Sequence, residues 1–324
     1  MEKKDLRIVF MGTPEFAVGT LSRLVDDGYN IVAVVTQPDK PVGRHQDTLQ
    51  PSAVKEYALA HAIPVLQPVK MKDPAFVEAL ASYKADLQVV VAFRMLPEVV
   101  WSMPRFGTFN VHAALLPQYR GAAPINWAVI NGETKTGVTT FFLDKNIDTG
   151  RIILEKPFDI PDEADVEYVY DGLMKLAPTI AEETIDLLLT SNGEISTQPQ
   201  DGLVSETETL HPAPKIFKET CRINWDQPAK KVYDFIRGLS PHPGAWTVLH
   251  GQKDTELKIF KAAKTGLPTG AATPGTIEAA KKTLRIACAD AWLEIFSLQL
   301  AGKKRMEATA FLNGNKEIAT CHVK

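Results

Sequence analysis

Cysteine is scarce in this chain of 324 residues, long apolar runs are missing, and no loop is rich in glycine. The three cysteines, Cys221, Cys288 and Cys321, are widely spaced and form no C-x-x-C pair. This spacing argues against a disulfide framework and a zinc site, and it is typical of a reducing cytoplasm. No apolar run approaches the roughly 18 residues of a membrane-spanning helix, and the N-terminal residues lack a secretory cleavage pattern. We therefore expect a cytoplasmic protein with no membrane partner and no metal.

A glycine-rich nucleotide motif is missing as well. The first predicted strand (6–11) ends at Gly12, where a dinucleotide-binding fold has G-x-G-x-x-G. Here the turn reads Gly12-Thr-Pro-Glu-Phe16, in which Thr13 is expected to cap the following helix. The single glycine argues against NAD or FAD, and so against a nicotinamide dehydrogenase. It also argues against a glycine-rich phosphate site.

What the sequence does contain is an alternation of strands and helices. Hydrophobic residues make up 45% of the chain, enough for a sizeable core, and the length is typical of two domains. Apolar runs predict strands at 6–11, 30–35, 64–66, 86–92, 107–112, 137–143 and 152–157. Helical spacing separates several of them, so we predict an α/β fold with a doubly wound, mostly parallel sheet. The stretch 37–51 is rich in proline and polar residues, which indicates a loop.

The second half of the chain has a different pattern. A long helix is predicted over 165–189, where Pro178 is expected to kink or split it, and the polar stretch 191–214 is expected to be a linker. Short strands separated by turns then predict a small, OB-like antiparallel β-barrel. We place one domain at residues 1–205 and the second at 206–324.

Net charge hides an asymmetry between these two parts. The whole chain carries a formal charge of −3. Residues 1–205 have 18 Lys and Arg against 27 Asp and Glu, a balance of −9, whereas residues 206–324 have 18 against 12, a balance of +6. Because a polyanion responds to local charge, the basic second domain is the expected surface for a nucleic acid.

Two polar residues at the end of the predicted strand 107–112 are candidates for catalysis. Asn110 and His112 are two positions apart, so both side chains point to one side of the strand. An amide donor beside an imidazole suits the stabilisation of an oxyanion in acyl transfer. Taken alone, such a pair more often satisfies local backbone groups, and Asp148 in Asp148-Thr-Gly150 more often makes a tight turn.

Together with longer stretches of sequence, these residues form a specific pattern. It comprises FMGTPEFAV (10–18), TQPDKPVGR (36–44), NVHAALLPQYRGAAP (110–124), IDTG (147–150), RINW (222–225) and SLQLAGKK (297–304). The chain resembles the formyltransferase family that uses 10-formyltetrahydrofolate as co-substrate. The turn at 12–16, the 36–44 loop and the second domain resemble the branch whose acceptor is initiator methionyl-tRNA, in translation initiation. The resemblance implies a Rossmann-like formyltransferase domain followed by an OB-like domain.

The resemblance implies roles for individual residues. Asn110 and His112 would bind the formyl oxygen as it becomes an oxyanion. Asp148 would orient His112, favour its protonated form and help to carry protons to N10 of the folate. Neither a metal nor a covalent intermediate is needed. The folate site would be lined by Ala114, Leu115, Leu116 and Pro117.

Some positions depart from the family pattern. Ala114 stands where serine is usual, Gln118 where arginine is common, and the loop 92–97 looks one residue short. These departures leave the chemical step intact and concern the contacts of the pterin. Arg120 is expected to pair with an acid and hold its loop, without a catalytic role.

On the acceptor side, the resemblance implies that Arg44, together with Lys40, contacts the tRNA. Trp225 and Trp246 are expected to belong to the core of the second domain rather than to stack on bases. We expect a monomer. Three alternatives stay open: a formyltetrahydrofolate hydrolase, a formyltransferase for another amine such as an amino sugar, and an RNA-binding protein without catalysis.

Overall fold

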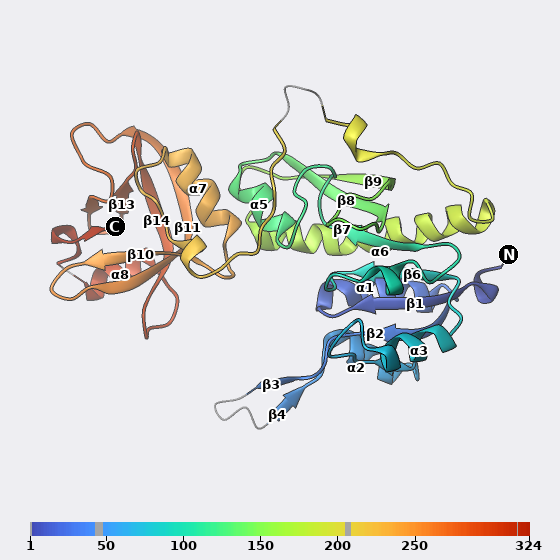
Figure 1. Ribbon diagram of the computed structural model, residues 1–324. Coiled ribbons are helices and arrows are strands. Elements are labelled where there is room, and N and C mark those ends of the chain that lie inside the picture. Colours follow the sequence, from blue (N-terminus) through green and yellow to red (C-terminus); the bar gives the residue numbers. More distant parts are fainter. Residues whose placement is uncertain (1, 43–47, 205–208, 316) are drawn as a thin grey trace. The chain divides into compact units, whose positions relative to one another are not determined.

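A computed structural model describes residues 2–42, 48–204, 209–315 and 317–324. The chain forms two compact units (Figure 1). The first unit comprises Met1–Gly121, Thr136–Phe158 and Asp171–Pro212, and the second comprises Ala122–Lys135, Asp159–Tyr170 and Ala213–Lys324. The boundary that we expect after residue 205 lies in the segment 205–208, outside the described residues.

The first unit is built on a seven-stranded sheet, counted over the described residues, with the order β5-β2-β1-β6-β7-β8-β9. Its strands are β1 (Arg7–Gly12), β2 (Asn30–Val35), β5 (Val65–Leu66), β6 (Leu87–Val91), β7 (Thr108–His112), β8 (Lys135–Phe142) and β9 (Ile152–Asp159). The pairs from β5 to β7 are parallel, whereas β8 runs antiparallel to β7. This order confirms the doubly wound, mostly parallel sheet that the alternating pattern predicts.

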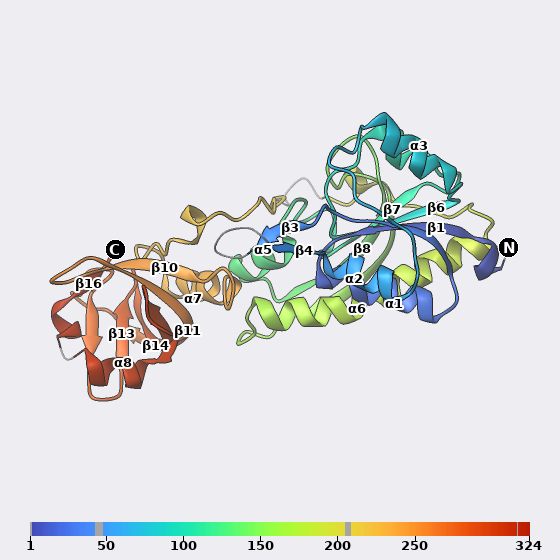
Figure 2. The same ribbon diagram turned by 90° about the horizontal axis from the view of Figure 1, so that it is seen from below.

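Helices cover both faces of this sheet. They are α1 (Glu15–Asp26), α2 (Ala53–Ala60), α3 (Pro74–Ser82), α4 (Glu98–Trp101) and α6 (Val166–Thr190). Figure 2 shows α3 on one side and α1 and α6 on the other. On the α3 side, Phe76 and Leu80 are buried in one cluster with Val9 and Met11 of β1. Because neighbouring residues of a strand point to opposite faces, the continuous apolar run of β1 supplies both layers of the core.

The turn between β1 and α1 differs from our expectation for Thr13. The helix begins at Glu15 with Pro14 as its N-cap, and the Thr13 hydroxyl is buried without a hydrogen-bond partner in the described residues. The prediction that Thr13 caps the helix was therefore wrong. A Cβ on Gly12 would come within 2.7 Å of the Ala17 Cβ, so the glycine lets the helix pack closely on the strand end.

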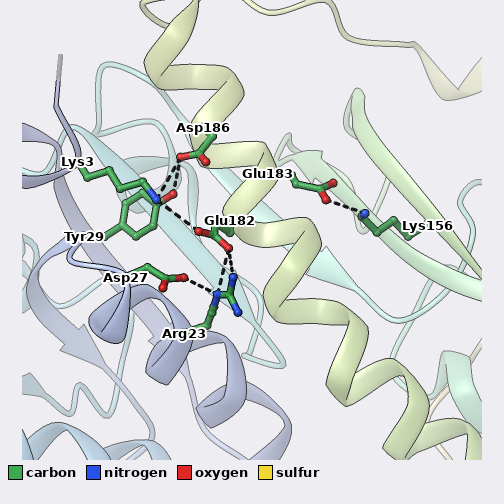
Figure 3. A network of polar contacts seen from close by, with 8 residues as sticks. All are labelled: Lys3, Arg23, Asp27, Tyr29, Lys156, Glu182, Glu183 and Asp186. Carbon is green, nitrogen blue, oxygen red and sulfur yellow. Dashed lines mark hydrogen bonds and ion pairs between the residues drawn. The ribbon is translucent and has the colours of Figure 1, made fainter.

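A network of charged side chains joins α6 to the start of the sheet (Figure 3). Glu182 accepts from Lys3 at 3.3 Å and from Arg23 Nε at 3.0 Å, and the Tyr29 hydroxyl donates to Asp186. Burial and this hydrogen bond raise the pKa of Tyr29. Lys3, which precedes β1, and Arg23 of α1 thus neutralise this acidic side of α6. Pro178 lies inside α6 without dividing it.

The stretch between β2 and α2 contains a short hairpin, where we expect a loop throughout. Strands β3 (Lys40–Val42) and β4 (Thr48–Gln50) pair antiparallel, and their side chains are mostly exposed. Figure 1 shows the hairpin extending away from the main sheet. At its root Asp39 accepts hydrogen bonds from Lys55 and Gln67, both at 2.7 Å, and these bonds lower the pKa of Asp39.

The second unit is an antiparallel, nearly closed barrel with the strand order β12-β13-β14-β11-β10-β16. Its strands are β10 (Ala245–His250), β11 (Thr255–Pro268), β12 (Ile277–Ala279), β13 (Leu284–Ala287), β14 (Ala291–Leu300), β15 (Met306–Glu307) and β16 (His322–Val323). A bridge between Thr276 and His322, with the bond from Val323 N to Gly275 O at 2.9 Å, brings the outer strands together. The barrel expected from the short strands is confirmed.

The helices of the second unit come from distant parts of the sequence. They are α5 (Pro124–Ile130), α7 (Ala229–Gly238) and α8 (Ala308–Gly314). Asn126 of α5 donates to the Gly238 carbonyl at 2.9 Å. The buried Arg237 of α7 donates to Asp234 and to the Ala164 carbonyl, each at 2.8 Å. The second unit is therefore completed by residues that precede the linker.

Trp225 and Trp246, both expected in the core of the second domain, differ in their surroundings. Trp225 is buried in the core of the barrel and donates to Thr247 at 3.1 Å, as we predict for a packing residue. Trp246 is only half-buried, and its ring has Lys218 and Arg222 each 5.6 Å from its centre. Trp246 is thus partly a core residue and partly a surface residue.

Over the described ranges, no helix combines the length and hydropathy needed to cross a bilayer.

Candidate active site

Asn110 lies on β7, which is flanked by β6 and β8 in the middle of the sheet. It pairs with Val90 on one side and with Phe141 on the other, so its backbone position is fixed. Its side chain is half-buried and has no hydrogen-bond partner among the described residues. A positioned amide with free N–H groups can bind a ligand without first breaking a bond within the protein.

His112 ends the same strand and is 6% exposed. Its Nε2 lies 2.9 Å from the carbonyl oxygen of Tyr119, and its ring meets the edge of Phe141. Because a carbonyl can only accept, Nε2 carries the proton and donates it. Nδ1 is therefore the ring nitrogen that is left for a substrate.

Asp148 faces the imidazole from the loop between β8 and β9. Its Oδ2 lies 3.9 Å from His112 Nδ1, which is longer than a hydrogen bond, and accepts from Gly121 N at 2.9 Å. The structure thus brings Asp148 and His112 together, as the family resemblance implies. The direct hydrogen-bond partner of the imidazole is Tyr119 instead.

The loop that carries Asp148 is tightly constrained. Asp144 accepts from Asn146 N at 2.9 Å and from the Thr149 hydroxyl at 2.7 Å. Asp148 itself has a φ of +55°, in the left-handed region. At Gly150 a Cβ would overlap the Phe142 carbonyl oxygen and lie 2.8 Å from its carbon. The glycine is needed because the two sides of the loop touch there.

The segment 114–117 follows His112 and packs against β8. The Thr139 hydroxyl donates to Ala114 O at 2.7 Å and accepts from Leu116 N at 3.1 Å. Ala114 and Leu116 are 0% and 3% exposed, and Pro117 is buried too, whereas Leu115 is half-buried. The side chain of Leu115 and the backbone are thus the parts of this segment that a ligand can reach.

The loop after β6 is held by Arg94. This side chain donates to the carbonyls of Pro68 and, at 2.9 Å, of Val69, and burial lowers its pKa. Met95 in the same loop is 69% exposed. The departure from the family pattern at 92–97 is therefore an ordered turn that presents an apolar side chain.

Arg120 has a neutral partner, where we expect an acid. Its Nε and Nη2 donate to Oε1 of Gln200 at 3.0 and 2.7 Å. The expected acid pair was thus wrong, although the arginine does hold its loop. Neither Gln200 nor the Tyr119 carbonyl could be identified from the sequence. One lies in a polar linker, and the other is a backbone atom without any side-chain signature.

Two residues are expected to contact tRNA. Lys40 is exposed on β3, and Arg44 lies outside the described residues. In the described part of the chain no group of three or more His, Cys, Asp or Glu could hold a metal ion. Cys221 and Cys288 are buried, and burial raises the pKa of Cys288 to about 12, so its thiol is unreactive.

Comparison with known proteins gives consistent matches over nearly the whole chain. The formyl transferase model matches residues 6–185, and the model of the formyl transferase C-terminal domain matches residues 215–316. A methionyl-tRNA formyltransferase of Parabacteroides distasonis is 58% identical over 323 residues, which cover 98% of each chain. A methionyl-tRNA formyltransferase of Bacteroides fragilis is 55% identical over 318 residues, which cover 97% of this chain and 96% of that one.

Solved structures resemble the fold at lower identity. WlaRD, a sugar 3N-formyl transferase crystallised with dTDP and 5-N-formyl-THF, matches with a TM-score of 0.63 and 18% identity, over 92% of this chain and 99% of that chain. HypX from Aquifex aeolicus, in complex with tetrahydrofolic acid, matches with a TM-score of 0.61 and 20% identity. That match covers 97% of this chain and 47% of HypX. These two matches concern the fold alone.

Proposed function

The chain belongs to the formyl transferase family, and from this premise we propose that it formylates the α-amino group of methionine on initiator methionyl-tRNA, with 10-formyltetrahydrofolate as the donor. The observation that carries the proposal is full-length similarity at 58% identity to a protein of that activity. The unpaired amide of Asn110 on the strand of His112, with Asp148 near the imidazole, supports the proposed reaction chemically.

In the proposed reaction the amine nitrogen bonds to the formyl carbon while the bond from that carbon to N10 of the folate breaks. The amine loses a proton, and N10 gains one. Asn110 donates an N–H to the formyl oxygen as negative charge develops on it. No rearrangement of the fold is needed, because this amide has no partner within the described residues.

His112 acts through Nδ1, since Nε2 is committed to Tyr119 O. A proton on Nδ1 supplies a second N–H donor for the formyl oxygen. Asp148 Oδ2 lies 3.9 Å from this nitrogen. The carboxylate attracts the charged imidazole and holds the Gly121 amide at the same time. We propose that this pair stabilises the oxyanion, that the imidazole passes its Nδ1 proton to N10, and that it then takes up the proton lost by the amine.

The donor site is proposed to lie along the segment 114–117 and the loop after β6. The pterin and its linker are flat and apolar with polar edges. Leu115 offers a half-buried apolar contact, and Met95 an exposed one. The buried neighbours Ala114, Leu116 and Pro117 shape the backbone of this wall rather than contact the ligand.

The acceptor is proposed to contact both units of the protein. Lys40 on the exposed β3–β4 hairpin, and Arg44, are assigned to the acceptor end of the tRNA by resemblance. In the second unit Lys218 and Arg222 flank the half-buried ring of Trp246, a combination that suits phosphates and a base. We further propose that the enzyme is a monomer and works in the cytoplasm, without a membrane partner.

One assay tests the acceptor. Purified protein receives 10-formyltetrahydrofolate with methionyl initiator tRNA, free methionine, a dTDP-linked amino sugar, or no acceptor. We expect N-formylmethionine to accumulate on tRNA only, at a rate that falls steeply with added salt. Equal formylation of free methionine or of the sugar would favour another transferase. Release of formate without acceptor would favour a hydrolase.

A further inference from the structure

Part of the linker contacts the loop that follows His112 and the loop that carries Asp148. Gln198 forms two backbone hydrogen bonds with Ile152, both at 2.9 Å, at the start of β9. Gln200, two residues later, is only 2% exposed. A glutamine this deeply buried in a polar linker needs partners for its amide, because an unpaired buried amide is costly.

All polar groups of the Gln200 side chain are used. Nε2 donates to Asp148 O at 2.9 Å and to Gly150 O at 2.7 Å. Oε1 accepts from two nitrogens of Arg120, at 3.0 and 2.7 Å. Gln200 thus joins the loop after His112 to the loop with Asp148. The Asp148 carboxylate meets the first of these loops a second time at Gly121 N.

The end of the linker holds Tyr119, whose carbonyl is the hydrogen-bond partner of His112. Tyr119 N donates to His211 O at 2.8 Å, and His211 N donates to Gln118 Oε1 at 2.8 Å. The rings of Tyr119 and His211 stack with centres 6.0 Å apart. Since Tyr119 O accepts from His112 Nε2, this contact fixes the carbonyl on which the imidazole rests.

We propose that Gln200 is a positioning residue for Asp148, and that the linker thereby forms part of the catalytic scaffold. The inference rests on the proposed function and assigns a role to a residue outside the reacting groups. Asp148 has a left-handed backbone, which a non-glycine residue adopts only when its surroundings hold it there. Two N–H donors on its own carbonyl and on that of Gly150 supply this restraint.

The hydrogen-bonding needs of the groups around position 200 explain why a glutamine fits there. The two carbonyls need donors, whereas Arg120 needs an acceptor. A glutamate at 200 would satisfy Arg120 but would place an acceptor oxygen against two carbonyl oxygens. Gln200→Glu therefore separates the two contacts. If the glutamine served only to anchor Arg120, the glutamate would replace it.

The kinetic test compares Gln200→Ala and Gln200→Glu with Gln88→Ala. Gln88 is a matched control, since it is equally buried in the same unit but contacts Thr108 and not the two loops. We expect both Gln200 variants to lower kcat by about 10- to 100-fold with KM for tRNA and folate nearly unchanged. Gln88→Ala should lower the melting temperature and leave kcat within about twofold. Full activity of Gln200→Glu, or an equal loss in Gln88→Ala, would overturn the proposal.

A double-mutant cycle shows whether Gln200 acts through Asp148. In an Asp148→Asn background, assayed at high enzyme concentration, Gln200→Ala should lower kcat by less than about threefold, because the residue it positions is already disabled. The same large loss as in the wild type would refute the role.

Hydrogen exchange of the Gly121 amide, which donates to Asp148, gives a readout that does not depend on turnover. It should quicken at least about tenfold in Gln200→Ala and not in Gln88→Ala. If the wild type fails to formylate tRNA while this difference persists, the proposed function fails and the positioning role stands. If the exchange is unchanged, the positioning role fails.

Discussion

Replacing Asn110 by alanine should separate activity from stability. The side chain makes no hydrogen bond to another described residue, and its strand is held on both sides by β6 and β8. Truncation therefore breaks no bond within the fold, and the free energy of unfolding should change by about 1 kcal/mol or less. The transition state, in contrast, loses one donor to the oxyanion. Loss of such a donor lowers kcat by about 10²- to 10³-fold, or about 2.7–4 kcal/mol.

The isosteric change Asn110→Asp makes the test sharper. It keeps the shape of the side chain but replaces both N–H donors by a negative charge beside the developing oxyanion. We expect it to be slower than Asn110→Ala, although it is the smaller change in volume. A residue that served only to fill space would give the opposite order.

The assay is single-turnover formylation of methionyl-tRNA with saturating folate, alongside thermal and urea unfolding of each variant. Asn30→Ala is the control, since this amide on β2 donates to the Lys4 carbonyl at 3.1 Å in an exposed position. It should retain the wild-type rate. A loss of less than about tenfold in Asn110→Ala with intact folding, or aspartate faster than alanine, would refute the oxyanion role.

Three further predictions concern other parts of the chain. His112→Ala should lower kcat by about 10²- to 10⁴-fold while circular dichroism stays native, and a near-normal rate would remove His112 from the mechanism. Gly150→Ala should lower the free energy of unfolding by about 1–3 kcal/mol in urea titrations, because its Cβ meets the Phe142 backbone; unchanged stability would show that the loop can open freely. Arg44→Ala should raise KM for tRNA, reduce its salt dependence by about one unit of slope and leave KM for folate unchanged; the same tRNA dependence as the wild type would contradict a phosphate contact.

Much of the fold follows from local sequence patterns. The strand predicted at 30–35 coincides with β2, and the apolar run 6–11 differs from β1 by one residue at each end. Buried strands are easily predicted because both faces must be apolar. The β3–β4 hairpin was not predicted, because its strands are exposed and form only a two-stranded sheet, in which Pro41 pairs with Leu49. Hydrophobic periodicity carries no signal for such a hairpin.

The candidate site was predictable only where chemistry resides in side chains. The spacing of Asn110 and His112 placed both on one strand end, and resemblance added Asp148. The groups that hold His112 and the Asp148 loop in place could not be predicted from residue spacing or from the resemblance. Tyr119 acts through its carbonyl, and Gln200 meets Arg120 across 80 positions of sequence. The partner of Arg120 was mispredicted because sequence favours a charged partner, whereas the buried site uses a neutral one.

The second unit of the protein also has a consequence for the order of synthesis. Helix α5 packs on α7, with Gly238 directly against Ile130, yet about 100 residues separate the two along the chain. At roughly 5–20 residues per second, a ribosome needs about 5–20 s to make that stretch. During this interval Ile130, the α5 residue that lies against Gly238 and the core of the second unit, has no partner helix. The nascent chain therefore carries α5 with its α7-facing side uncovered while the strands β1, β2, β5, β6 and β7, which precede α5, can already pair. This uncovered side is a natural target for a chaperone that binds chains as they leave the ribosome.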